Sequence, residues 1–179
     1  FSRAPESDTV LDKLYAAGFD VWSVGKIDDI FAHRGITRKN HTLGNKESTN
    51  ITINLLSESF KGLLFVNLIE FDMIFGHRND PQGYYDALKA FDDAIPKIQA
   101  SLAEDDLVIV SADHGVDPTT KSTDHSREYV PLLAFGKRVR GVNLGVRKTF
   151  ADVGATITEN FKVQPPEIGT SFLSDLTRI

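Results

Sequence analysis

Residues 106–127 read DLVIVSADHGVDPTTKSTDHSR, and this stretch decides the fold. It begins with the apolar run Leu107 to Val110, which is typical of a buried parallel strand. The loop that follows carries Asp113 and His114 together, with His125 near its end. Because open α/β sheets bind ligands at the carboxyl ends of their strands, we expect a metal site in this loop.

A second apolar run, residues 63–69, leads into a similar group of polar residues. Asp72 and His77 follow this run within a few positions, so two predicted strands deliver carboxylates and imidazoles toward one edge of a sheet. Three of the chain's five histidines lie in these two segments. The predicted metal ligands are Asp72, His77, Asp113, His114 and His125.

Mixed nitrogen and oxygen ligands suit Zn²⁺, Mn²⁺ or Fe²⁺, whereas sites made only of oxygen favour Mg²⁺ or Ca²⁺. Five ligands exceed what one tetrahedral ion uses. A two-metal site, with ions about 4 Å apart, is the arrangement that serves phosphoryl transfer. Any one of these residues taken alone is equally well explained as an ordinary polar loop residue, but the recurrence after two strands favours a site.

The order of predicted elements indicates one α/β domain over residues 1–179, with a mostly parallel sheet flanked by helices on both faces. We expect a first helix capped by Ser7 or Asp8 and ended by Gly18, and a polar loop at residues 33–46 with two solvated histidines. Strands are expected at residues 19–24, 63–69, 106–110 and 129–135. Further helices are expected after Ser48 or Thr49, from Pro81 with Pro96 inside it, and after Thr149.

The composition excludes several classes of partner. A formal charge of −5 argues against nucleic acid, whose binders are usually basic. The absence of cysteine removes disulfides and thiolate ligands, and no apolar segment has the length of a membrane span. We therefore expect a soluble, cytoplasmic protein without a membrane partner. The basic residues within 137–148 could face a phosphate, but a solvated loop explains them better.

Two cations near the predicted cluster are candidates for contact with a substrate phosphate. Lys26 follows the strand at residues 19–24, which brings it to the same sheet edge, and Arg127 ends the loop that carries His125. Surface salt bridges are an equally good explanation for both residues.

Several motifs together resemble bacterial phosphopentomutases, a family within the alkaline phosphatase superfamily. These motifs are FDMIFGHRND at residues 71–80, ADHGVDP at 112–118 and TDHSRE at 123–128, with GKI at 25–27 and TFADVG at 149–154. The spacing agrees across three separated segments. The resemblance therefore covers nearly the whole chain.

The resemblance implies an isomerase of nucleoside catabolism that interconverts ribose 1-phosphate and ribose 5-phosphate, and their deoxyribose analogues, through a phosphorylated threonine and two Mn²⁺ ions. By this resemblance, Asp113 and His114 hold one ion, and Asp72, His77 and His125 hold the other. Family members are about twice as long as this chain. We therefore expect a C-terminal fragment of an incomplete alkaline phosphatase-like core, inactive alone.

The parts expected to be missing are an N-terminal core strand, the loop with the nucleophilic threonine, and a cap domain. The chain by itself then holds no catalytic nucleophile. Alternatives within the superfamily are a cofactor-independent phosphoglycerate mutase or a phosphodiesterase. An alternative of another class is a non-catalytic metal-binding or interaction domain. The sequence leaves the oligomeric state open.

Overall fold

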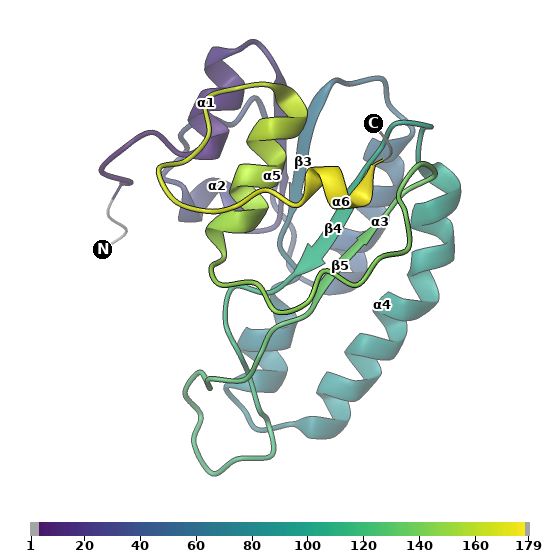
Figure 1. Ribbon diagram of the computed structural model, residues 1–179. Helices are drawn as coiled ribbons and strands as arrows, with labels where there is room; N and C mark the ends of the chain where they lie inside the picture. Colours follow the sequence, from purple (N-terminus) through teal and green to yellow (C-terminus); the bar gives the residue numbers. More distant parts are fainter. Residues whose placement is uncertain (1–3, 178–179) are drawn as a thin grey trace.

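The computed structural model describes residues 4–177 and has an α/β fold (Figure 1). Three parallel strands form a sheet in the order β2-β1-β3. They are β1 (Asp20–Val24), β2 (Arg38–Asn40) and β3 (Gly62–Val66), and they alternate with α1 (Val10–Ala16), α2 (Ile27–Ile30) and α3 (Asn45–Leu56). The predicted class, a parallel sheet flanked by helices, is confirmed.

Strand β1 is buried on both faces because helices cover each side of it. Val21 packs in a cluster with Leu14 of α1 and with side chains of the C-terminal helix α5 (Ala151–Phe161). Its neighbour Trp22 packs instead against Leu55 of α3. Successive side chains of a strand point to opposite faces, so these two clusters are the two sides of the sheet.

The strand after residue 106 pairs differently from the prediction. β4 (Val108–Ser111) pairs antiparallel with β5 (Leu132–Phe135), and these two strands form a sheet of their own. Among residues 4–177, no strand is hydrogen-bonded to the second edge of either β3 or β4. Consequently β4 is only half-buried, although its apolar run indicates a fully buried strand.

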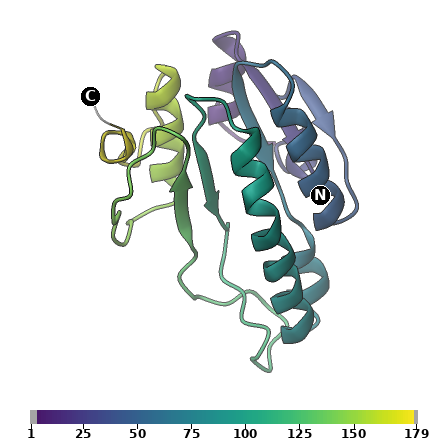
Figure 2. The same cartoon turned by 90° about the vertical axis from the view of Figure 1, so that its right-hand side faces the viewer.

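The long helix α4 (Pro81–Ser101) begins where the sequence predicts it (Figure 2). Pro81 occupies its first position, and the side chain of Asp80 caps it by accepting a hydrogen bond from the Gly83 N–H at 2.9 Å. Pro96 lies inside the helix, which continues to Ser101. The chain ends in α5 and the short helix α6 (Leu173–Leu176).

Three details of the prediction are wrong. The cap of α1 is Thr9, not Ser7 or Asp8, because Thr9 and Asp12 exchange hydrogen bonds in a capping box. The expected loop at residues 33–46 contains β2. The helix expected after Ser48 or Thr49 is α3, which begins earlier, at Asn45. β2 has no apolar alternation, since its residues are Arg-Lys-Asn, and only its backbone pairing with β1 defines it.

A buried carboxylate fastens the C-terminal segment to α5. Asp152 accepts a hydrogen bond from the Thr170 N–H at 2.8 Å and one from Arg147 Nε at 2.8 Å. The Thr170 hydrogen bond lowers the pKa of Asp152; burial acts in the opposite direction, and the bond and charge of Arg147 reinforce the lowering. A depressed pKa in the folded state stabilises the fold above the unfolded value of 3.8, and this contribution is lost as the pH falls.

Replacement of Asp152 by asparagine is therefore expected to lower the free energy of unfolding at neutral pH by about 2 kcal/mol, because Arg147 loses its charged partner. The corresponding loss in melting temperature is roughly 4–8 °C. Thermal melts of the wild type and the variant across an acid series measure it. The difference should shrink below about pH 4, where the wild-type carboxylate also becomes protonated. A difference that stays constant with pH would show that packing alone is responsible.

Candidate metal centre

Two loops deliver the predicted ligands to one place. After β3 the chain forms the π-helix η1 (Phe71–Gly76), which carries Asp72 and is followed directly by His77. The loop after β4 carries Asp113 and His114. A bridge between Gly115 and Ser126 closes this loop, with the Ser126 N–H donating to the Gly115 carbonyl at 3.0 Å, and so places His125 beside His114. π-Helical turns occur often at functional sites.

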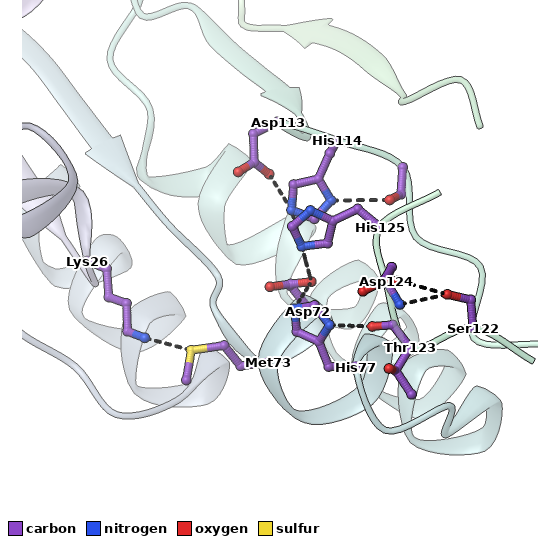
Figure 3. Close-up of polar contacts among 11 residues, drawn as sticks. Lys26, Asp72, Met73, His77, Asp113, His114, Ser122, Thr123, Asp124 and His125 are labelled. Carbon is purple, nitrogen blue, oxygen red and sulfur yellow. Dashed lines mark hydrogen bonds and ion pairs between the residues drawn. The ribbon is translucent and has the colours of Figure 1, made fainter. Parts of the chain in front are cut away.

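The side chains converge on a single oxygen atom, Asp72 Oδ1 (Figure 3). The Nε2 atoms of His125, His77 and His114 lie 3.3, 3.4 and 4.0 Å from it. His114 Nε2 also lies 3.7 Å from Asp113 Oδ1. The five residues chosen from the sequence therefore form one continuous cluster.

Backbone carbonyls orient two of the three imidazoles. Nδ1 of His77 lies 2.5 Å from the Thr123 carbonyl oxygen, and Nδ1 of His114 lies 3.2 Å from that of Gly115. A carbonyl only accepts, so each Nδ1 carries the proton and donates it. In a neutral ring Nε2 is then an acceptor, directed toward Asp72, and this second hydrogen bond is the usual support of a metal-binding histidine.

The donor set fits a metal ion. Asp72 Oδ1 is buried and has no hydrogen-bond partner among the described residues. Acceptor atoms that face one another repel unless a proton or a cation lies between them. Ligand atoms placed tetrahedrally about 2.1 Å from one ion are about 3.4 Å apart, which matches the separations from Asp72 Oδ1 to His77 and His125.

The structure does not divide the cluster into the two groups implied by the resemblance. His114 and His125 stack, with ring centroids 3.6 Å apart and an interplanar angle of 16°. Candidate ligand atoms of Asp72, His114 and His125 all lie within 4.8 Å of one another. Asp113 is at the outside of the cluster, with its side chain 84% exposed. His114 is thus placed between the two groups.

A neutral hydroxyl lies close to the cluster. Burial, and secondarily the negative charge of Asp72, raises the pKa of Tyr84. Tyr84 packs against Phe71 with ring centroids 5.3 Å apart. It therefore contributes no negative charge that would compete for a cation.

The two candidate phosphate-binding cations pair with no carboxylate among the described residues. Lys26 points toward η1, and its Nζ contacts Met73 Sδ at 2.6 Å (Figure 3). Arg127 is exposed, and no hydrogen bond or ion pair is found for it within residues 4–177. The competing explanation for both, a surface salt bridge, has no support in this part of the chain.

A second cluster, formed by Asp28, Asp29 and His33, has the composition of a metal site. However, Asp28 is already satisfied: its Oδ2 lies 2.7 Å from His33 Nδ1 and 3.3 Å from Lys39 Nζ. Burial would raise the pKa of Asp28, but the hydrogen bonds and charges of His33 and Lys39 outweigh burial and lower it. The Lys39 ammonium already supplies the positive charge, so this cluster is a structural ion-pair network.

Sequence reasoning missed three features around the cluster. The π-helix has no apolar periodicity of its own, and the Thr123 carbonyl is a backbone group that no side-chain pattern indicates. Asn45 and Glu70 form a hydrogen-bonded pair at the start of η1. No sequence pattern predicts this pair, because the two residues are 25 positions apart.

Comparison with known proteins defines the class. The sequence profile of the metalloenzyme superfamily matches residues 9–165, and the chain belongs to this superfamily. The chain is similar to phosphopentomutases, with 58% identity to that of Herpetosiphon aurantiacus over 98% of the chain and 45% of the relative. Its identity is 55% to that of Carboxydothermus hydrogenoformans, over 99% of the chain and 46% of the relative.

The resemblance predicted from the motifs is therefore confirmed. The chain spans about half the length of the curated relatives it matches. Within residues 4–177, no helix combines the length and the apolar character that crossing a bilayer requires.

Proposed function

We propose that the protein containing this chain is a phosphopentomutase that interconverts ribose 1-phosphate and ribose 5-phosphate, or their deoxyribose analogues, in nucleoside catabolism. The observation that carries this proposal is the convergence of three imidazoles on the buried, unpaired oxygen of Asp72. The identity of 48–58% to phosphopentomutases over nearly the whole chain supports the same reaction. Because phosphorylated sugars do not cross membranes freely, a cytoplasmic location is part of the proposal.

We assign two Mn²⁺ ions to the centre. Asp113 and His114 would hold one, and Asp72, His77 and His125 would hold the other. When bound, such ions polarise a phosphoryl group and activate a hydroxyl nucleophile. The carbonyls of Thr123 and Gly115 keep the imidazoles of His77 and His114 in the orientation that ligation needs.

The remaining charges of the site suit a dianionic substrate. Lys26 and Arg127 would contact the substrate phosphate, because neither has a carboxylate partner among the described residues that would compete. The nucleophilic threonine and the other ligands of the first ion are proposed to lie outside this chain. Its own residues then bind and orient, and none of them forms the covalent intermediate.

The same proposal accounts for the separation of the strands into two sheets, β2-β1-β3 and β4-β5. We propose that an N-terminal core strand and a cap domain, outside residues 1–179, complete the fold. The second edges of β3 and β4 are unpaired in the described part of the chain, and β4 is only half-buried. An additional strand between these edges would satisfy their backbone groups and bury their apolar side chains.

The direct test is an assay of the full-length protein, with formation of ribose 5-phosphate from ribose 1-phosphate followed in the presence of Mn²⁺. We expect conversion that a chelator abolishes, and none with the chain of residues 1–179 alone. Interconversion of phosphoglycerates, or hydrolysis of a phosphodiester, in place of sugar-phosphate conversion would refute the proposal. Either result would assign the protein to another branch of the superfamily.

Replacing Lys26 with methionine is expected to raise the KM for ribose 1-phosphate by roughly 10-fold, because one charge-assisted contact to phosphate is lost. The Mn²⁺ dissociation constant should not change, since Lys26 contacts Met73 and none of the candidate ligands. Initial rates and calorimetric titration measure the two quantities. An unchanged KM would remove Lys26 from the substrate site.

A further inference from the structure

We propose that Asn45 and Glu70 act as positioning residues that hold Asp72 in the geometry for metal binding. The two residues exchange hydrogen bonds at the start of η1, and we call this pair the Asn45–Glu70 bracket. The inference rests on the proposed function, because it treats Asp72 as a metal ligand. Neither residue of the bracket contacts the metal cluster itself.

The bracket is reciprocal. The Asn45 N–H donates to Glu70 Oε2 at 2.5 Å, and the Glu70 N–H donates to Asn45 Oδ1 at 3.0 Å. Asn45 is the first residue of α3, and Glu70 directly precedes η1. The bracket therefore joins a helix on one face of the sheet to the segment that carries the candidate ligands.

The Glu70 carboxylate supplies the cap that α3 lacks. The N-cap residue of α3 is Gly44, which has no side chain to cap the helix. A Cβ atom placed on Gly44 would lie only 3.1 Å from the carboxylate of Glu70, so glycine leaves room for it. A carboxylate at a helix N-terminus is stabilised by the free N–H groups and by the helix dipole. This makes the bracket a strong and directional link.

The link acts on Asp72 through a short stretch of backbone. Asp72 is two residues after Glu70, and the carbonyl of Asp72 accepts a hydrogen bond from the His77 N–H at 2.9 Å. Displacement of Glu70 would therefore move Asp72 and His77 together. Ligation tolerates such displacement poorly, because ligand atoms must lie within about 0.2 Å of their metal distances.

The bracket also leaves one buried polar group unpaired, which lowers the stability of the fold. Asn45 Oδ1 accepts from Glu70, which leaves the Asn45 Nδ2 buried and without a hydrogen-bond partner among the described residues. An unpaired buried donor destabilises a fold. Retention of this arrangement next to the candidate ligands is consistent with a positioning role.

The test measures the Mn²⁺ dissociation constant of the full-length protein by calorimetric titration. Glu70→Ala and Asn45→Ala are each expected to raise this constant by about 10- to 100-fold, the range for loss of groups that support metal ligands. Each single variant removes one of the two hydrogen bonds and keeps the other, because the backbone N–H donors remain. The double variant removes both bonds and should bind Mn²⁺ more weakly than either single variant. Glu70→Gln keeps an acceptor for the Asn45 N–H and should recover most of the affinity.

Glu47→Ala is the matched control. Glu47 also lies in the first turn of α3, and its Oε2 accepts from the Leu43 N–H at 2.9 Å, but it makes no hydrogen bond to η1. We expect this variant to lower the melting temperature about as much as Glu70→Ala while leaving the Mn²⁺ dissociation constant unchanged. A purely structural bracket would weaken Mn²⁺ binding equally in both variants, and that result would overturn the inference.

The variant Asp72→Asn distinguishes a failure of the positioning role from a failure of the metal-ligand assignment. If Asp72→Asn weakens Mn²⁺ binding and Glu70→Ala does not, the bracket has no positioning role and the proposed function stands. If Asp72→Asn itself binds Mn²⁺ like the wild type, the ligand assignment is wrong, and the inference falls with it.

Discussion

Replacing Asp72 with asparagine is expected to lower the proposed mutase activity of the full-length protein by about 100-fold or more, beyond the usual effect of removing a group that only supports a metal ligand. Asp72 Oδ1 is the atom on which His77, His114 and His125 converge, and its negative charge is what an ion held there requires. Asparagine preserves the shape of the side chain and removes this charge. The fold should therefore survive while metal binding fails.

The measurement is kcat/KM for ribose 1-phosphate across a Mn²⁺ series, together with a thermal melt. Asp93→Asn provides the matched control, because Asp93 is an exposed carboxylate on α4 whose partner is Lys89. That variant should keep wild-type activity and the same Mn²⁺ requirement. Full activity of Asp72→Asn at low Mn²⁺ would exclude Asp72 from the centre.

Replacing Gly62 with alanine is expected to destabilise the fold by about 3 kcal/mol or more, which is large for a single methyl group. A Cβ atom at Gly62 would lie only 1.8 Å from the backbone oxygen of Asp20, the residue paired with it on β1. Backbone in the centre of a sheet cannot move aside as a flexible side chain can. The strands β1 and β3 would have to separate at this end.

The expected loss in melting temperature is roughly 6–12 °C for a chain of this size. Gly141→Ala is the control, because a Cβ atom there meets nothing within 4 Å. Melting temperatures of both variants are measured by circular dichroism. They compare the same added methyl group at a crowded position, Gly62, and at an open one, Gly141. Equal melting temperatures for the two variants would mean that β1 and β3 approach less closely than the structure shows.

Local chemistry explains what could be predicted from the sequence. Pro81 and the capping Asp80 define the start of α4 because they act within one helical turn. Gly18, expected at the end of the first helix, adopts a φ of 81°, which glycine reaches without steric cost. Apolar runs before Asp72 and Asp113 predicted two strands with polar residues at their ends, and both strands are present.

Pairing between distant segments accounts for what could not be predicted. The apolar run of β4 indicates burial but carries no information on direction, so its antiparallel pairing with β5 was not foreseen. β2 has no apolar pattern at all and exists because its backbone bonds to β1. In both cases the deciding groups are backbone amides and carbonyls, which every residue carries.

The candidate metal centre, like the fold, was only partly predictable from the sequence. The sequence by itself determined which residue types are available, because a carboxylate and an imidazole following each of two strands are the donors that a transition metal binds. Only the tertiary structure decided how they meet. The Gly115–Ser126 bridge brings His125 onto His114, and the Asn45–Glu70 bracket joins Glu70, two residues before Asp72, to α3. Such contacts join residues far apart in the chain, and their energies depend on distances that form only when the chain has folded.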